Sequence, residues 1–241
     1  DFARASSATR VNADGLIETV ATGVPRIDYS ESGCGKLLLE GQRTNLVTYS
    51  EQFDNAAWVK ANATVTANQI ASPDGDINAD LLESTLTTEP RIRQTTTQTG
   101  STAFTFSCFA KKGNVNFLIL RNIAVDLAGG SRAWFNLDTG VIGTVNSGLT
   151  ASMQNYGNGW YRCIITGTTD AIPTNLVDIA LSSTDNSFTG SAIGSNIYIW
   201  GAQLEQGSYL TSYITTAGAT ATRVAETANG AGDANTFNDS E

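Results

Sequence analysis

Aromatic, basic and amide side chains alternate with apolar ones in three strand-like runs, 103–111, 132–137 and 159–168. Successive side chains of a strand point to opposite faces of a sheet, so one set of each run faces a core and the other faces outward. The outward sets suit a sugar, because flat rings cover its C–H face while guanidinium and amide groups bond its hydroxyls in pairs. The predicted carbohydrate-binding residues, taken to share one sheet face, are Trp134, Arg132, Phe109, Lys111, Asn136 and Arg162.

Each of these aromatic side chains also has a structural interpretation. It can belong to a core, to a subunit interface or to a face on which a terminal arm docks. Trp160 stands beside a turn, which favours structural packing. Trp200 shares its parity with Tyr198, Ala202 and Leu204, and this pattern predicts a core position rather than a platform for a ligand.

The residues needed for common catalytic mechanisms are missing or unpaired. The sequence contains no histidine, which excludes Ser-His-Asp and Cys-His catalysis and zinc sites built with histidine. Glycoside hydrolysis needs two acids flanking the scissile bond, and no local pattern among the 23 Asp and Glu residues proposes such a pair. The turn at 32–36 lacks the spacing of a phosphate-binding loop. We therefore expect no catalytic residues and no enzymatic activity, with a polysaccharide depolymerase as the enzymatic alternative.

Charge and hydropathy restrict the partners. The chain carries 14 Lys and Arg against 23 Asp and Glu, for a net charge of −9, and its only basic runs are 91–93 and 111–112. Nucleic acid requires clustered positive charge, so we expect no nucleic-acid partner. A polyanionic glycan would need a local basic patch on so acidic a chain. No apolar run reaches the ~20 residues of a membrane span, so no membrane partner is expected.

The three cysteines are Cys34, Cys108 and Cys163. An odd count with wide spacing is not a disulfide framework. Cys108 and Cys163 stand in strand-like runs and are predicted to be small buried hydrophobes, with a bridge between them as the alternative. The count fits synthesis in a reducing cytosol.

Short strand-like runs separated by Gly, Asn, Asp and Ser fill residues 46–210. Many short strands at spacings of about 8–12 residues predict an all-β fold, a jelly-roll β-sandwich. The predicted strands are 63–69, 79–84, 90–97, 103–111, 116–121, 132–137, 141–145, 150–155, 159–168, 176–183 and 196–205.

The two ends of the chain carry a weaker pattern. Residues 1–45 hold only short strand candidates, at 16–20, 25–29 and 36–40, and are expected to be an irregular attachment arm that packs on a partner or on the next domain. Residues 211–241 are rich in Thr, Ala, Gly and Asn and are predicted to be a linker or arm. Since the chain has no initiator Met and no terminating element, we expect it to be a piece of a longer polypeptide.

Several sequence blocks resemble the virion fibre and spike proteins of tailed bacteriophages, whose middle is a jelly roll of the carbohydrate-binding-module type. The blocks are 5–12, 15–17, 25–29, 43–46, 49–54, 157–162, 201–205 and 211–214. The resemblance implies a virion protein, made in the bacterial cytoplasm, that belongs to a head or tail fibre or spike. It implies capsid or tail proteins as partners, a homotrimer, and contact with host surface polysaccharide. A decoration or connector protein without a glycan ligand is the alternative.

A calcium site is the remaining question of chemistry. The run 74–80 places oxygen-bearing side chains at alternate positions, as a calcium loop does. Ala79 stands where that loop needs glycine and Thr85 where it needs a bidentate Glu, so an ordinary turn is favoured. The related sugar-binding modules imply a structural calcium near the chain ends, for which Glu51, Asp54 and Gln203 are candidates. We expect no cofactor and no metal, with this structural calcium as the alternative.

Overall fold

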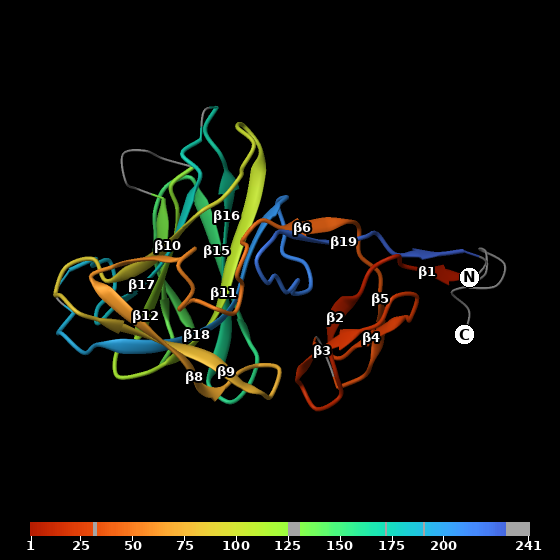
Figure 1. Cartoon of the computed structure of the whole chain (residues 1–241), viewed down its shortest axis with the longest axis horizontal. Helices are drawn as coiled ribbons and strands as arrows, with labels where there is room; N and C mark the ends of the chain where they lie inside the picture. The colour runs from red at the N-terminus through yellow and green to blue at the C-terminus, as the bar shows by residue number, and fades with distance from the viewer. Residues whose placement is uncertain (31–32, 125–130, 172, 190, 230–241) are drawn as a thin grey trace.

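A computed structural model describes residues 1–30, 33–124, 131–171, 173–189 and 191–229. Two six-stranded antiparallel sheets face each other as a jelly roll, which confirms the predicted fold class (Figure 1). The β12 sheet has the order β14-β13-β12-β17-β10-β7, with β7 Val59–Ala61, β10 Arg91–Thr95, β12 Phe117–Asn122, β13 Arg132–Asn136, β14 Val141–Val145 and β17 Leu176–Ser182. The β11 sheet has the order β15-β16-β11-β18-β9-β8, with β8 Ala63–Ala71, β9 Ile77–Ser84, β11 Ala103–Lys112, β15 Leu149–Asn155, β16 Trp160–Thr168 and β18 Asn196–Gln206.

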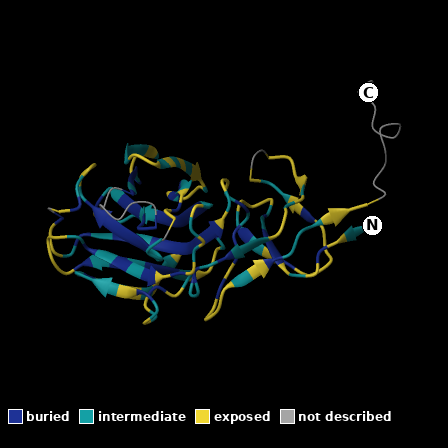
Figure 2. Cartoon of the chain, turned by 90° about the horizontal axis from the view of Figure 1, so that it is seen from above, coloured by how far each residue is buried: buried dark blue, intermediate teal, exposed yellow. Residues whose placement is uncertain are grey.

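The core lies between the two sheets, where Figure 2 shows the largest continuous stretch of buried residues. Phe104, Phe106, Cys108 and Ala110 alternate into it from β11, as their parity predicts. Cys163 lies directly opposite Cys108 on β16, and both thiols are free and buried, as expected. None of the described residues forms a helix, so none of them forms a helix able to cross a membrane.

The two ends of the chain pair with each other, which differs from the arm and the linker expected from the sequence. Strands β1 (Phe2–Ala3) and β6 (Arg43–Asn45) pair with β20 (Thr227–Ala228) and β19 (Ala221–Arg223). Two hairpins lie between them, β2 (Ala8–Val11) with β3 (Ile17–Val20), and β4 (Arg26–Asp28) with β5 (Lys36–Leu38). Together these eight strands form the hairpin lobe, beside the jelly roll in Figure 1. Their long-range pairing leaves no periodic signal in short segments.

Buried ion pairs hold the hairpin lobe together. The Glu226 carboxylate accepts hydrogen bonds from Arg4 Nη1 at 2.6 Å and Arg26 Nε at 2.8 Å. Glu40 pairs with Arg26 and Arg223, each at 2.9 Å. Burial alone would raise the pKa of Glu226, but the hydrogen bonds from Arg26 and Arg4 outweigh it and the pKa is lowered. This charge cluster (Arg4, Arg26, Glu40, Arg223 and Glu226) joins segments more than 180 residues apart.

A second apolar cluster fixes the hairpin lobe against the outer face of the β11 sheet. Val11 and Ile17 of the first hairpin pack with Phe109, Trp200 and Tyr213, all of them buried. The Ile17 N–H donates to the Pro73 carbonyl at 2.9 Å, which adds a backbone contact between hairpin and jelly roll. The outer face of this sheet is therefore partly covered. Trp200 is buried there, as expected, but on the opposite face from Ala202 and Leu204, because β18 is irregular at Gly201, which adopts a φ of 59°.

Candidate functional site

The six predicted carbohydrate-binding residues do not share a surface, which corrects the sequence-based prediction. Arg132, Trp134 and Asn136 lie on β13, in the β12 sheet. The other three, Phe109, Lys111 and Arg162, lie on β11 and β16, in the β11 sheet. The outward faces of two opposed sheets point away from each other, so alternation along single strands cannot reveal which outward sets meet.

Trp134 is the centre of a small packed cluster rather than a platform for a sugar. It is 2% exposed and packs with Ile119, Ala180 and Phe188. Its indole Nε1 donates to the Ser187 carbonyl at 2.9 Å, and this bond satisfies its polar group. A sugar ring cannot stack on a face that other side chains already cover.

Arg132 and Asn136 also have structural contacts. The Arg132 guanidinium lies 4.6 Å from the ring centre of Phe188 and 5.9 Å from that of Trp134. Asn136 Oδ1 accepts from the backbone N–H groups of Asp138 and Thr139 at 3.0 and 3.2 Å. Asn136 therefore fixes the turn between β13 and β14, as asparagine commonly does.

On the β11 sheet, Phe109 faces outward as predicted but is fully covered. Its ring makes edge contacts with Tyr156, Trp200 and Tyr213 at centroid distances of 4.9, 5.3 and 5.9 Å. Lys111 is half-buried and its side chain lies over the turn glycine Gly159. Phe109 therefore supports the residues above it and cannot itself touch a ligand.

Arg162 is the predicted residue that lies at a cavity. Two adjoining cavities of about 210 and 380 Å³ separate the hairpin lobe from the β15–β16 edge of the jelly roll. They share Val11, Ser30, Gln154 and Tyr156, and together form what we call the hairpin groove. Charged, aromatic and amide side chains line this groove, among them Asp28, Tyr29, Glu40, Asn155, Tyr156 and Arg162.

A tight turn positions Tyr156 at the jelly-roll side of the groove. Asn155 Oδ1 accepts from the Gly157 N–H at 2.8 Å, and the Trp160 N–H donates to the Gly157 carbonyl at 2.8 Å. Gly157 and Gly159 adopt φ of 77° and 79°, which glycine reaches without steric cost. The Tyr156 ring makes a T-shaped contact with Phe109 and stays partly exposed at the groove.

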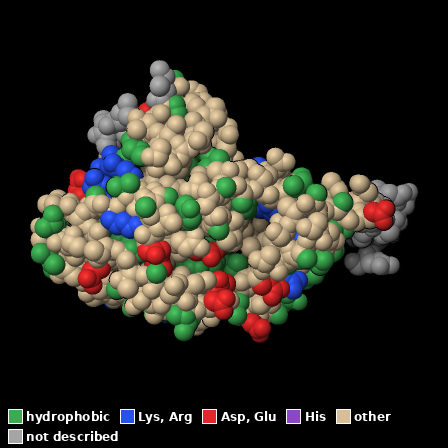
Figure 3. Space-filling model, in the orientation of Figure 1, with side chains coloured by type: hydrophobic (Ala, Val, Ile, Leu, Met, Phe, Trp, Pro, Cys, Tyr) green, Lys and Arg blue, Asp and Glu red, His purple; other side chains and the backbone are tan. Residues whose placement is uncertain are grey.

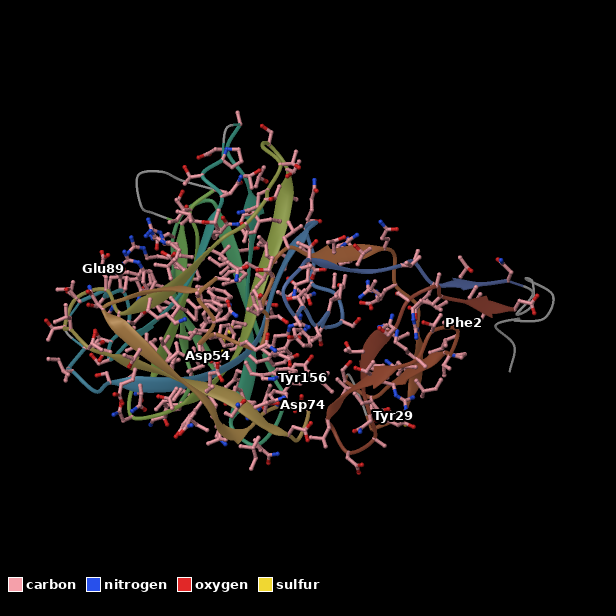
Figure 4. All side chains as sticks on the ribbon, in the orientation of Figure 1. Phe2, Tyr29, Asp54, Asp74, Glu89 and Tyr156 are labelled. Atoms are coloured by element: carbon pink, nitrogen blue, oxygen red, sulfur yellow. The ribbon has the colours of Figure 1, made fainter. Side chains whose placement is uncertain are left out.

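Tyr29 lies on the opposite side, at the hairpin lobe, as Figure 4 shows. Its backbone N–H donates to the Val11 carbonyl at 3.0 Å. Its ring covers Gly35 so closely that a Cβ there would lie 2.7 Å from Tyr29 Cζ. Gly35 is therefore needed for the position of this ring, and two tyrosines from distant segments flank one groove.

Arg162 differs from the arginines of the charge cluster because none of the described acids forms an ion pair with it. Its Nε and Nη1 donate to Ser107 Oγ at 3.3 Å and to the Thr211 carbonyl at 3.0 Å, and its guanidinium lies 5.0 Å from the centre of the Phe109 ring. The side chain is 2% exposed, and among the described residues Nη2 has no hydrogen-bond partner. A buried cation of this kind raises the local affinity for polar or anionic groups.

The two carboxylates of the groove are engaged in holding the backbone. Asp28 accepts from the N–H groups of Val11 at 2.8 Å and Ser30 at 2.9 Å, which ties the second hairpin to the first. Glu40 accepts from Ser212 N at 2.8 Å and Ser212 Oγ at 2.6 Å in addition to its ion pairs. Their main effect is to shape the groove.

The calcium candidates are dispersed. Asp74 holds its own turn, accepting from Asp76 N at 2.8 Å and Asn78 Nδ2 at 2.9 Å. Glu51 accepts from the Tyr213 hydroxyl at 3.0 Å, and burial raises its pKa. Gln203 Oε1 accepts from Ile214 N at 2.6 Å. Within the described ranges, no group of three acidic or cysteine side chains could hold a metal ion.

Sequence reasoning missed Tyr29, Tyr156 and the groove between them. Tyr156 stands between two predicted strands in the glycine-rich turn 155–159, which is a local signal for an exposed ring at a tight turn. The location of Tyr29 opposite it depends on how the hairpin lobe packs, for which no local signal exists.

Two solved structures that resemble this chain in fold are a phage tailspike domain and a xylanase. One is the enzymatically active domain of tailspike protein 4 of bacteriophage CBA120, with 16% identity and a TM-score of 0.41 over 68% of this chain and 21% of that one. Another is the Clostridium thermocellum N-terminal endo-1,4-beta-D-xylanase 10B, as CBM22-1–GH10 modules complexed with xylohexaose, with 10% identity and a TM-score of 0.41 over 70% of this chain and 30% of that one. The chain thus spans less than a third of either neighbour. No protein-family model and no curated protein matches it.

These neighbours contradict the expectation that the chain is not an enzyme. One is described as an enzymatically active domain and the other as a xylanase. The expectation of no enzymatic activity is therefore corrected. At identities of 16% and 10% the similarity concerns the fold, and it assigns no catalytic residue to this chain.

Proposed function

We propose that this chain is a glycan-binding domain of a phage fibre or spike, and that the hairpin groove is where it contacts host surface polysaccharide. The observation that carries the proposal is that one groove holds two partly exposed tyrosines, Tyr29 and Tyr156, together with Arg162, which has no ion pair with any described acid. Concave sites with aromatic walls and a few convergent polar groups are typical of small-molecule and sugar recognition.

The chemistry of the groove matches a pyranose. Its aromatic rings provide flat apolar faces for the C–H side of the sugar. Gln154 and Asn155, both exposed, provide planar amides for hydroxyl groups, and Ser30 adds a hydroxyl on the hairpin side.

The virion setting rests on the sequence blocks that resemble phage fibre and spike proteins. Several of them have structural roles in the hairpin lobe and its contact with the jelly roll: 25–29 carries Tyr29, and 157–162 carries the turn glycines and Arg162. The resemblance therefore coincides with the groove residues. Attachment to capsid or tail proteins and assembly as a trimer belong to the same proposal.

Binding of host envelope polysaccharide by the wild type and by Tyr156→Ala and Tyr29→Ala tests the proposal. Loss of one stacking ring is expected to weaken binding by about 1–3 kcal/mol. Tyr209→Ala is the matched control, since Tyr209 is exposed and lies outside the groove. Equal binding by wild type and both groove variants would refute the site. Assaying the same mixtures for released reducing ends tests for glycan cleavage.

A further inference from the structure

A row of arginines crosses the outer face of the β12 sheet, on the side of the jelly roll away from the hairpin groove. In the strand register Arg93 stands opposite Asp178, Asp178 opposite Arg121, and Arg121 opposite Arg132. Arg91 lies two residues along β10, on the same face. These four residues, Arg91, Arg93, Arg121 and Arg132, form what we call the arginine row.

Within the described ranges, Asp178 and Glu89 contact Arg91, Arg93 and Arg121, so that three cations face two carboxylates. Asp178, fully buried, bonds Arg93 through both oxygens at 2.6 and 2.8 Å and lies 3.6 Å from Arg121 and 3.8 Å from Arg91. Glu89 pairs with Arg91 at 2.6 Å. Among the described residues, Asp178 is therefore shared by three arginines, of which Arg91 also pairs with Glu89.

The register places like charges side by side. Arg121 and Arg132 are direct cross-strand neighbours, an arrangement that destabilises a sheet. Burial lowers the pKa of Arg121, and the nearby Arg132, Arg93 and Arg91 lower it further against the opposing effect of Asp178. Arg121 therefore lies in a locally positive environment, where a bound anion would be stabilised.

The row is open to solvent. The side chains of Arg91, Arg93 and Arg121 are 17%, 27% and 14% exposed, so their stems are buried while part of each remains accessible. Figure 3 shows the largest group of Lys and Arg side chains of the visible face on the side where Figure 1 places β10 and β17. On a chain of net charge −9 this is a local basic patch.

We propose that the arginine row is a second binding site, which takes the carboxylate groups of an acidic polysaccharide. A guanidinium fork pairs with a carboxylate through two parallel bonds, as Arg93 does with Asp178. Adjacent strands lie about 4.8 Å apart, so the row extends over several strands. A small anion can bridge neighbouring arginines, whereas a polymer with repeated charges can contact the whole row. Nucleic acid is disfavoured, because the acidic remainder of the chain repels its continuous phosphate backbone.

The test measures binding of polygalacturonate, dextran sulfate, neutral dextran, single-stranded DNA and inorganic phosphate at equal ionic strength. Polygalacturonate is expected to bind and to raise the melting temperature, and neutral dextran is expected to do neither at this site. Arg121→Gln should weaken polygalacturonate binding about tenfold. Lys112→Gln, which removes one positive charge from the opposite sheet, should leave binding unchanged.

The melting temperature of the ligand-free protein distinguishes a structural role of Arg121 from a role in binding. Since Arg121 opposes Arg132, Arg121→Gln should keep or raise the melting temperature without ligand while losing the shift that polygalacturonate causes. Equal loss of polygalacturonate binding in Arg121→Gln and in the control Lys112→Gln would overturn the site. Binding to dextran sulfate alone, equal binding of DNA, or a full effect from inorganic phosphate would each overturn the assignment to a carboxylate polymer. Tyr156→Ala should leave this binding intact, so failure here is distinct from failure of the groove.

Discussion

Glu226→Gln is the sharpest test of how the hairpin lobe is held. The substitution preserves shape but removes the charge that Arg4 and Arg26 share, and both arginine side chains are fully buried. It also replaces an oxygen that accepts from the Glu40 N–H at 2.9 Å by a group that can donate. Arg26 would keep its ion pair with Glu40 at 2.9 Å, whereas Arg4 would lose its pair with Glu226.

The expected magnitude follows from burial. Breaking a buried ion pair by removing one partner costs about 3–5 kcal/mol, because the other charge stays desolvated. Glu18→Gln is the matched control: Glu18 also pairs with an arginine, Arg10, but the two side chains are 38% and 27% exposed. Exposed pairs contribute about 0–1 kcal/mol, so the control should lose little.

Hydrogen exchange and denaturant unfolding measure the difference. Glu226→Gln should increase exchange in β2–β5 and β19 before it affects the jelly-roll core, since the jelly roll has its own core. Acid should weaken the lobe in the same way, because the pKa of Glu226 is lowered in the folded state. The stability that the Glu226 carboxylate contributes is present above its unfolded pKa near 4.5 and is lost as the pH falls through the lower, folded pKa. Equal protection of the lobe in Glu226→Gln and Glu18→Gln would refute the reasoning.

Three further predictions address single positions. Burial raises the pKa of Asp80 to about 6 from 3.8, so the folded state holds this proton more tightly than the unfolded one. Stability should therefore fall by roughly 3 kcal/mol between about pH 4 and 6, and urea unfolding of wild type against Asp80→Asn isolates this slope. Gly35→Ala should displace Tyr29 and weaken glycan binding, whereas Gly33→Ala, with no atom within 4 Å of its new Cβ, should not; equal affinities would count against the placement of that ring. Trp134→Ala should lower the free energy of unfolding by about 3–5 kcal/mol, and an unchanged urea midpoint would contradict its burial.

The strands of the jelly roll were predictable because alternation is a local signal. The run 103–111 shows apolar residues at every second position, and the structure places β11 at Ala103–Lys112 with those residues in the core. The run 196–205 likewise corresponds to β18 at Asn196–Gln206. Parity also placed Phe109 outward, which the structure confirms. Trp200 is buried as expected, but it packs with Phe109 on the outer face and not with Ala202 and Leu204, because the pairing of β18 with β11 shifts register between them.

The site was not predictable in the same way, since its parts meet through long-range contacts. Nothing within residues 1–45 indicates that Arg26 finds its acid at Glu226. Likewise, the parity of Trp134 predicts on which face of the sheet its side chain lies. It does not predict that Phe188, 54 positions further along the sequence, packs against that side chain. Short-range patterns describe the strands, and the pairing of distant segments decides which surfaces remain open.

The arginines of this chain divide into two groups, and the division explains why both proposals concern ligands. Arg4, Arg26 and Arg223 each contact a glutamate of the charge cluster, and their burial is explained by the lobe they hold. Arg162 is as deeply buried but forms no ion pair with an acid in the described part of the chain, and three arginines of the arginine row share Asp178. A chain with only 14 basic residues gains nothing in folding from placing cations where their charge is not balanced. Their positions are therefore best explained by groups that arrive from outside the chain, at the groove and at the row.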